Sequence, residues 1–228
     1  MGMRVILTGA TGMIGRAVLL ECLASDRVDA ILAVTRRPLG ESHPKLREAL
    51  LEDFTRFEEL SGAFRDFQPT ACFHCMGVSS VGMNEEDYTR LTLGVADSLS
   101  ATLMEVNPEI VCCYVSGAGS DETESSRTMW ARVKGKTENL ILNRGFRDAY
   151  AFRIGGVIPR KGVKSRTGWV NVLLQIMRPA FSLLSRFSAI IESPQVGQAM
   201  INLVEAPHAV KVLDNPVIAE VAERGQEK

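Results

Sequence analysis

Short apolar runs alternate along the chain with longer segments of helical periodicity. The runs lie at residues 3–7, 30–34 and 110–115, and within residues 70–77 and 149–158, and a further strand is expected at residues 46–51. Runs without polar alternation are typical of strands buried on both faces of a parallel sheet. Apolar side chains at helical spacing over residues 84–105 predict a long helix that ends at Asn107–Pro108. Strands alternating with helices predict an α/β fold with a doubly wound parallel sheet and helices on both faces.

The first strand runs into a glycine-rich turn and the start of a helix. Gly9 lets the chain turn off the strand, Gly12 lets a phosphate approach the backbone, and Gly15 lets the helix pack closely on the sheet. The N-terminus of the helix then offers unpaired N–H groups and a positive dipole end to an anion. This pattern predicts a Rossmann-type dinucleotide site. The alternative is a turn that merely needs small residues.

Residues 8–15 read Thr-Gly-Ala-Thr-Gly-Met-Ile-Gly. This segment resembles the opening of the short-chain dehydrogenase/reductase superfamily, and its extended and atypical branch of epimerases, dehydratases and small NADPH-binding regulators most of all. The resemblance implies a nicotinamide cofactor and a small-molecule substrate, whose identity stays unknown. The residues expected to bind the cofactor are Gly9, Thr11, Gly12, Met13, Ile14, Gly15, Arg36, Arg37, Asp53, Phe54, Cys75, Met76, Gly77, Lys134, Ile154 and Val157.

The end of the second predicted strand favours NADP over NAD. An acidic residue at this position usually binds the ribose hydroxyls of NAD, and an arginine accommodates the extra phosphate of NADP. Arg36 and Arg37 occupy the position here, and a guanidinium binds phosphate through paired, charge-assisted hydrogen bonds. The alternative is a pair of solvated loop arginines.

Two further strand ends are assigned by the resemblance. In the family, an acidic residue after the third strand lies near the adenine, and Asp53 is the candidate. Asp53 could instead cap a helix that begins near Arg56. After the fourth strand, Gly77 fits a small-residue turn that lets the ribose and phosphates pass. His74 on that strand is expected to be a packed core residue.

The expected catalytic residues depart from the family pattern. In the family, the fifth strand ends in a serine that binds the reacting group, and a helix then carries a proton-exchanging tyrosine and, one turn later, a lysine that tunes it. Here Lys134 is present, but Trp130 stands at the tyrosine position. An indole N–H donates a hydrogen bond and does not exchange a proton near neutral pH. The spacing places Gly117 at the serine position, one residue after Ser116.

Two interpretations follow from this departure. Either the chain binds NADP with its proton-transfer pair disrupted and serves a regulatory or altered oxidoreductase role, or it is an active NADP-dependent reductase, epimerase or dehydratase with another acid. Candidates for that acid are Ser116, Ser120, Asp121 and Tyr88. Trp130 could stack near the nicotinamide or plug the pocket.

The C-terminal third is expected to form the substrate side of a single domain. Residues 1–228 are interpreted as one NAD(P)-binding domain, in which residues 156–206 contribute substrate-side elements. The basic residues near its start either hold an anionic substrate or form a solvated loop; they are Arg160, Lys161, Lys164 and Arg166.

An apolar stretch at residues 169–187 is too short and too interrupted by Arg178–Pro179 to span a membrane. It is expected to cover the substrate cleft or to form a homo-oligomer or protein-partner contact, which makes a protein-interaction module a third functional class. An amphipathic membrane anchor is the less favoured alternative.

Composition bears on binding to nucleic acid or metal and on the cellular location. The net charge of −1 implies no general attraction to nucleic acid. The five cysteines are odd in number and scattered over apolar segments, which indicates buried thiols in a reducing compartment. Cys72 and Cys75 are expected on opposite faces of a strand, so no metal site is predicted. Without a signal-peptide pattern at the N-terminus, the cytoplasm is the expected location.

Overall fold

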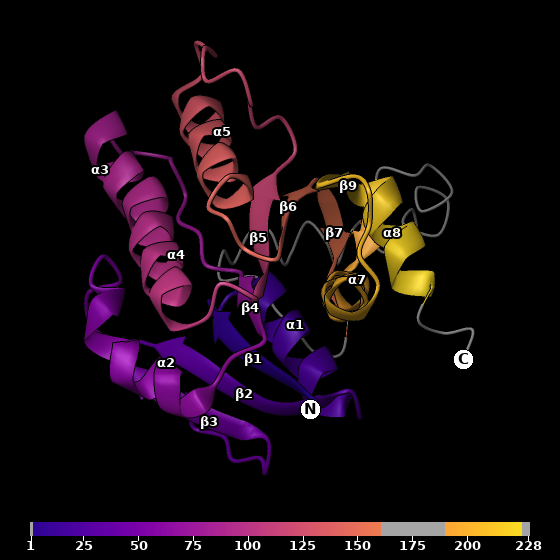
Figure 1. The fold of residues 1–228 in the computed structure, drawn as a ribbon. Helices are drawn as coiled ribbons and strands as arrows, with labels where there is room; N and C mark the ends of the chain where they lie inside the picture. Colours follow the sequence, from indigo (N-terminus) through magenta and orange to yellow (C-terminus); the bar gives the residue numbers. More distant parts are fainter. Residues whose placement is uncertain (1, 161–189, 225–228) are drawn as a thin grey trace.

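A computed structural model describes residues 2–160 and 190–224 (Figure 1). A seven-stranded parallel sheet forms its centre, in the order β3-β2-β1-β4-β5-β6-β9. Its strands are β1 (Met3–Thr8), β2 (Val28–Thr35), β3 (Leu46–Leu50), β4 (Ala71–His74), β5 (Val111–Gly117), β6 (Asp148–Ile154) and β9 (Val212–Asp214). The predicted doubly wound α/β fold is confirmed.

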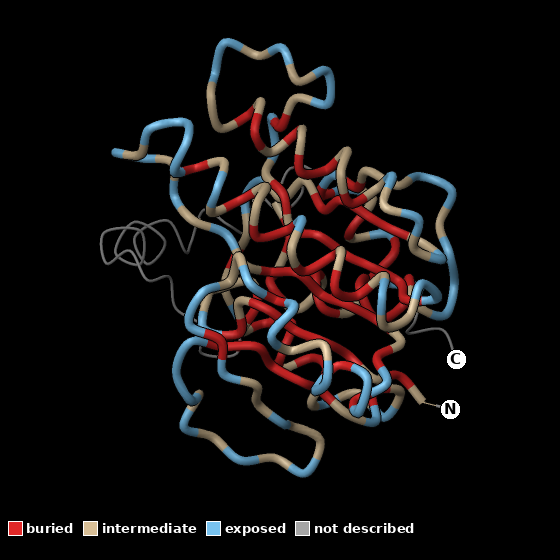
Figure 2. The backbone as a smooth tube through the Cα atoms, turned by 60° about the vertical axis from the view of Figure 1, so that its left-hand side comes forward, coloured by how far each residue is buried: buried red, intermediate tan, exposed pale blue. Residues whose placement is uncertain are grey.

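Helices cover both faces of this sheet (Figure 1). One face carries α1 (Met13–Ala24), α7 (Ser193–Glu205) and α8 (Asn215–Glu223), and the other carries α2 (Ser61–Phe67), α4 (Val95–Val106) and α5 (Met129–Leu142). Two separate hydrophobic clusters follow from this, one on each face. Figure 2 shows buried residues concentrated along the central strands, between the two helical layers.

The strands supply side chains to both clusters in alternation. Cys72 belongs to the cluster under α4, and Cys75, just past the end of β4, belongs to the cluster under α1 and α7. The two thiols therefore lie on opposite faces, as expected. All five cysteines are free and buried, and burial raises the pKa of Cys22 and Cys75 well above the ordinary thiol value.

A small second sheet follows β6. In it, β7 (Gly156–Ile158) pairs in parallel with β8 (Ile190–Glu192), which leads directly into α7. Glu192 and Gln195 form a capping box at the start of α7. The apolar stretch at residues 169–187 and the basic residues from Lys161 to Arg166 lie outside the described residues.

The predicted helix over residues 84–105 is present and contains a π turn. It consists of α3 (Glu85–Thr89), a π-helical turn (Arg90–Gly94) and α4. The helix therefore runs without a gap from Glu85 to Val106, and the π turn within it inserts a residue that periodicity does not reveal. Such turns are frequent at functional sites. The helix expected near Arg56 begins as a short 3₁₀ turn (Phe57–Leu60) that continues into α2.

Candidate functional site

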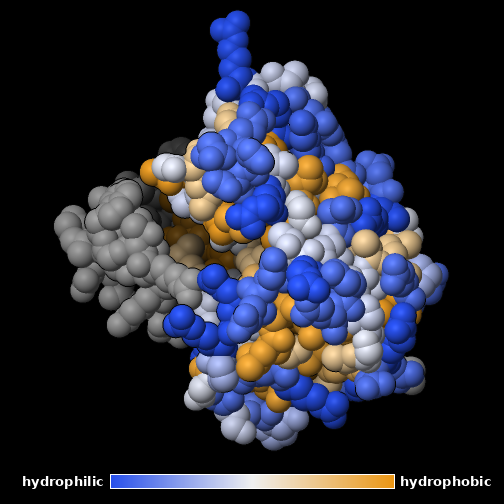
Figure 3. All heavy atoms as spheres, turned by 90° about the vertical axis from the view of Figure 1, so that its left-hand side faces the viewer, coloured by the Kyte–Doolittle hydropathy of each residue, from blue (hydrophilic) through white to orange (hydrophobic). Residues whose placement is uncertain are grey.

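A cavity of about 700 Å³ lies at the carboxyl ends of β1, β2 and β4. The strand order reverses between β1 and β4, which is where ligands bind in open α/β sheets. Of the predicted cofactor residues, the cavity is lined by Gly9, Thr11, Gly12, Arg36, Arg37, Asp53, Phe54, Cys75, Met76 and Gly77. Figure 3 shows mixed charged and apolar side chains on the face that carries α2 and α3, and a hollow with apolar walls beside it.

The glycine turn has the backbone geometry of an anion cradle. Gly9 adopts a φ of +77°, which favours glycine. A Cβ built on Gly15 would lie 2.1 Å from the Gly9 carbonyl oxygen, so close packing of α1 on the turn requires glycine there. Gly12 caps α1 with no side-chain hydrogen bond, and no acidic residue lies in the first turn. The first N–H groups of α1 thus suit a phosphate, and the turn fits a dinucleotide.

Three arginines reach the same cavity. Arg36 and Arg37 follow β2, are exposed, and make no hydrogen bond or ion pair with any described residue. Arg90, on the π turn, also lines the cavity and pairs only loosely with Asp87, at 3.7 Å. Sequence reasoning missed Arg90, because α-helical periodicity does not locate a π turn.

Asp53 and Phe54 lie on the cavity wall after β3. The Asp53 carboxylate accepts hydrogen bonds from the backbone N–H and the hydroxyl of Thr55, at 2.9 and 2.7 Å. These bonds hold the pKa of Asp53 below its usual value. Arg56 is the residue that precedes the following 3₁₀ turn, so Asp53 does not cap that helix. A contact between Asp53 and adenine stays a prediction.

Lys134 lies beside the loop after β4 that lines this cavity. A Cβ built on Gly77 would lie 3.9 Å from Lys134 Nζ, so the lysine faces the small-residue loop after β4. Its Nζ donates hydrogen bonds to the Tyr114 hydroxyl, at 2.9 Å, and to the Val115 carbonyl, at 3.3 Å. Burial lowers the pKa of Lys134. This placement fits the ribose-holding role that the resemblance implies.

Trp130 fills the space above the end of β5. A Cβ built on Gly117 would lie 3.8 Å from its indole, and one built on Gly119 would lie 3.3 Å from it. Ser116 is buried, and its hydroxyl lies 2.9 Å from that of Ser120, which donates to the Gly117 carbonyl. Neither serine hydroxyl is therefore presented freely to the cleft.

The other proposed acids have structural partners. The Asp121 carboxylate accepts hydrogen bonds from backbone N–H groups of Thr123, Ser125 and Ser126, which shape the loop before α5. A hydrogen bond from the Thr123 hydroxyl is the main cause that lowers the pKa of Asp121. Tyr88 is buried, and burial raises its pKa. Neither Asp121 nor Tyr88 is therefore placed to donate a proton to a substrate.

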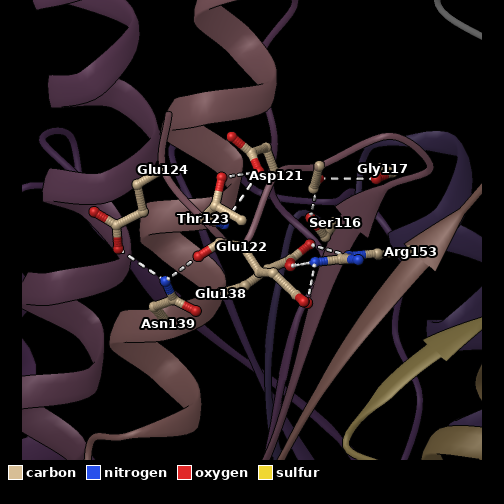
Figure 4. A network of polar contacts seen from close by, with 10 residues as sticks. Ser116, Gly117, Asp121, Glu122, Thr123, Glu124, Glu138, Asn139 and Arg153 are labelled. Carbon is tan, nitrogen blue, oxygen red and sulfur yellow. Dashed lines mark hydrogen bonds and ion pairs between the residues drawn. The ribbon is translucent and has the colours of Figure 1, made fainter. Parts of the chain in front are cut away.

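A buried ion pair fixes α5 against β6 beside the site (Figure 4). Glu138, on the helix turn after Lys134, is fully buried and accepts bonds of 3.0 and 2.7 Å from Arg153. Glu122 approaches the same guanidinium at 3.3 Å from the exposed side. No local pattern predicts this pair, because its members come from different elements.

The remaining predicted cofactor residues lie apart from the cavity wall. Met13 and Ile14 belong to the first turn of α1 behind the glycines, Ile154 ends β6, and Val157 lies in β7. Their cofactor contacts stay predictions. Among the described residues no cluster of side chains could hold a metal ion, and none of the described helices is long and apolar enough to cross a membrane.

Residues 5–106 match the model of the NAD dependent epimerase/dehydratase family. A curated relative, "Protein FMP52, mitochondrial" of Candida albicans (strain SC5314 / ATCC MYA-2876), is 24% identical over 181 residues, which cover 76% of this chain and 74% of that protein.

Solved structures with similar folds include a monomeric L-threonine 3-dehydrogenase from a metagenome, with a TM-score of 0.71, 17% identity and coverage of 96% of this chain and 80% of that one. Another is the UDP-glucose 4-epimerase of Thermotoga maritima, with a TM-score of 0.66, 14% identity and coverage of 99% and 84%. The first half of the chain is thus similar to the NAD dependent epimerase/dehydratase family, and the whole described fold is that of these solved structures.

Proposed function

We propose that the protein binds NADP(H) in preference to NAD(H). The observation that carries this is the pair Arg36 and Arg37, which line the cavity, stand at the end of β2 and have no described partner. The place of these guanidiniums suits the 2′-phosphate of the adenosine ribose. No carboxylate ends β2 to hold the hydroxyls of NAD. Lys134 would hold the nicotinamide ribose, and the bound cofactor would supply hydride chemistry.

Calorimetric titration with NADPH and NADH tests this proposal. We expect tighter binding of NADPH, and a loss of about tenfold or more in its affinity when Arg36 or Arg37 is replaced by alanine, because a charge-assisted hydrogen bond contributes about 1.5–3 kcal/mol. Affinity for NADH should hardly change in these variants. Arg47→Ala is the matched control, since Arg47 is exposed on neighbouring β3 and does not line the cavity. Equal affinity of the wild type for the two cofactors would refute the NADP assignment.

We further propose that the usual proton-transfer pair is disrupted, so that the role is regulatory or an altered oxidoreductase activity. Trp130 cannot exchange a proton near neutral pH, and its indole packs over Gly117, the position of the family's serine. The hydroxyls of Ser116 and Ser120 bond to each other. Cofactor binding without ready turnover of simple carbonyls is therefore expected.

The rival function is an active reductase, epimerase or dehydratase that recruits another acid. A panel of aldehydes, ketones and nucleotide sugars assayed with NADPH or NADP⁺ separates the two, by absorbance of the reduced cofactor and by chromatography of the sugars. Robust turnover by the wild type would overturn the disrupted-pair proposal and leave cofactor binding intact. A protein-interaction role through residues 169–187 rests on the sequence pattern alone.

For the cellular location we propose a reducing compartment, with the cytoplasm as first choice. The five free, buried cysteines support it. The curated relative is mitochondrial by its name, so fractionation of cells that express the tagged protein is the test.

A further inference from the structure

A phenol and an ammonium group are paired beneath the site, but the phenol comes from β5. Lys134 Nζ donates to the Tyr114 hydroxyl at 2.9 Å and to the Val115 carbonyl at 3.3 Å. The same nitrogen lies 4.9 Å from the centre of the Tyr114 ring. Two acceptors and an aromatic ring on a single strand thus fix the ammonium group of a long, flexible side chain.

Tyr114 does not take over the proton exchange of the missing tyrosine. Its side chain is only 1% exposed, so its hydroxyl has no access to a substrate. Burial raises the pKa of this phenol above its ordinary value, which also disfavours proton exchange. What the hydroxyl does offer is a fixed acceptor for Lys134.

Tyr114 is itself held through side chains of β4 and β1. Its ring stacks on His74 of β4, with ring centres 5.5 Å apart and an interplanar angle of 22°. His74 Nδ1 is hydrogen-bonded to the Thr8 hydroxyl of β1 at 2.7 Å, and Thr8 directly precedes Gly9 of the phosphate turn. A continuous row of side chains therefore links the first glycine of the turn to the lysine on α5.

We propose that Tyr114 is a positioning residue, which holds the Lys134 ammonium against the loop at Gly77, ready for the nicotinamide ribose of NADP(H). It supplies a fixed phenolic neighbour for Lys134, which Trp130 cannot. The inference rests on the proposed cofactor binding and adds how this chain keeps its lysine in place. It assigns Tyr114 to the nicotinamide half of the site and not to the adenosine half.

The test compares two ligands by calorimetry. NADPH reaches Lys134, whereas adenosine 2′,5′-bisphosphate fills only the adenosine half. Tyr114→Phe keeps the ring on His74 and removes the hydroxyl. We expect it to weaken NADPH binding about tenfold, the loss of a hydrogen bond to a charged group, and to leave the bisphosphate affinity unchanged.

Tyr150→Phe is the matched control. Tyr150 is a buried tyrosine on neighbouring β6. The ammonium nitrogen of Lys211 lies 4.6 Å from the centre of its ring. It has no contact with Lys134, so this variant should bind both ligands as the wild type does.

A double-mutant cycle checks that Tyr114 acts through Lys134. Lys134→Met should weaken NADPH binding, and adding Tyr114→Phe to it should cost little more, because coupled residues are not additive. Additive losses would overturn the inference. So would equal loss of both ligands in Tyr114→Phe, or no loss of either. If the wild type itself fails to bind NADPH, the proposed function falls with it, which is a distinct outcome.

A measurement on wild-type protein covers the case in which Tyr114→Phe does not fold. The chain has three tyrosines, so fluorotyrosine labelling gives a simple ¹⁹F spectrum, assigned through Tyr88→Phe and Tyr150→Phe. The Tyr114 signal should shift with NADPH and stay in place with adenosine 2′,5′-bisphosphate. A Tyr114 signal that NADPH leaves unmoved would refute the inference.

Discussion

His74 should make the folded protein sensitive to mild acid. Its side chain is 1% exposed, and burial, reinforced by the charge of Lys134, lowers its pKa from 6.5 to about 3. The groups that face it are the Thr8 hydroxyl, the Tyr114 ring and the Lys134 ammonium, and none of them is an anion. The folded state therefore keeps this imidazole neutral over a range in which the unfolded chain protonates it.

The sign and the size of the effect follow from proton linkage. Below the unfolded pKa of 6.5 and above the folded value of about 3, the unfolded state binds the extra proton, so stability falls as pH falls. The slope approaches about 1.4 kcal/mol per pH unit. Between about pH 7 and about pH 5 the loss from this one group is about 2 kcal/mol. Since whole domains are stable by about 5–15 kcal/mol, the loss is easily measured.

Urea unfolding followed by tryptophan fluorescence at several pH values provides the assay, with linear extrapolation to water. His74→Asn keeps a polar group near Thr8 and removes the titration, so its stability should be lower near neutral pH but flatter towards pH about 5. His208→Gln is the control, since His208 is partly exposed. If the wild type and His74→Asn lose the same free energy over this range, the reasoning from buried His74 is wrong.

Two further predictions concern packing. Arg153→Met should destabilise the fold by about 3–5 kcal/mol, because it leaves a buried carboxylate without its partner. Glu138→Gln should cost less, because the Glu138 side chain is 1% exposed whereas the Arg153 guanidinium that loses its partner is on a side chain that is 21% exposed. The reverse order of the two losses in urea unfolding would contradict this. Gly15→Ala should lower the melting temperature and abolish NADPH binding, because its Cβ would lie 2.1 Å from a carbonyl oxygen. A Cβ on Gly12 would lie 3.3 Å from the Gly9 carbonyl oxygen, so Gly12→Ala should fold but bind phosphate more weakly. A melting temperature of Gly12→Ala as low as that of Gly15→Ala would contradict this prediction.

Most of the sheet could be predicted because a buried parallel strand leaves a strong local signal. The apolar runs at residues 3–7 and 30–34 lie inside β1 and β2. The strand expected at residues 46–51 matches β3 within a residue, although β3 is an edge strand with no buried residue. The edge strand β9 is only three residues long, too short for any periodicity. The π turn after α3 was not predicted for a related reason, because one inserted residue does not change an otherwise helical pattern of apolar positions.

The candidate site divides in the same way. Its cofactor half depends on local chemistry, namely glycines in a turn and arginines at a strand end, so the sequence predicts residues that the structure brings to one cavity. Around Lys134, by contrast, the hydrogen bonds and ion pairs join residues of different elements, such as Tyr114 with Lys134 and Glu138 with Arg153. No spacing rule within one segment identifies such pairs, and only the fold reveals them.

The changes at the reaction half are coupled through packing. The Trp130 indole occupies the space above Gly117 and Gly119, and the backbone of Gly119 has a φ of +91° that favours glycine. Restoring a tyrosine at position 130 alone would recover a phenol but leave Gly117 without the hydroxyl that binds the reacting group in the family. Lys134, by contrast, draws its hydrogen bonds from β5 and not from residue 130. Lys134 is thus held independently of residue 130, so the proposed cofactor binding does not depend on a tyrosine at that position.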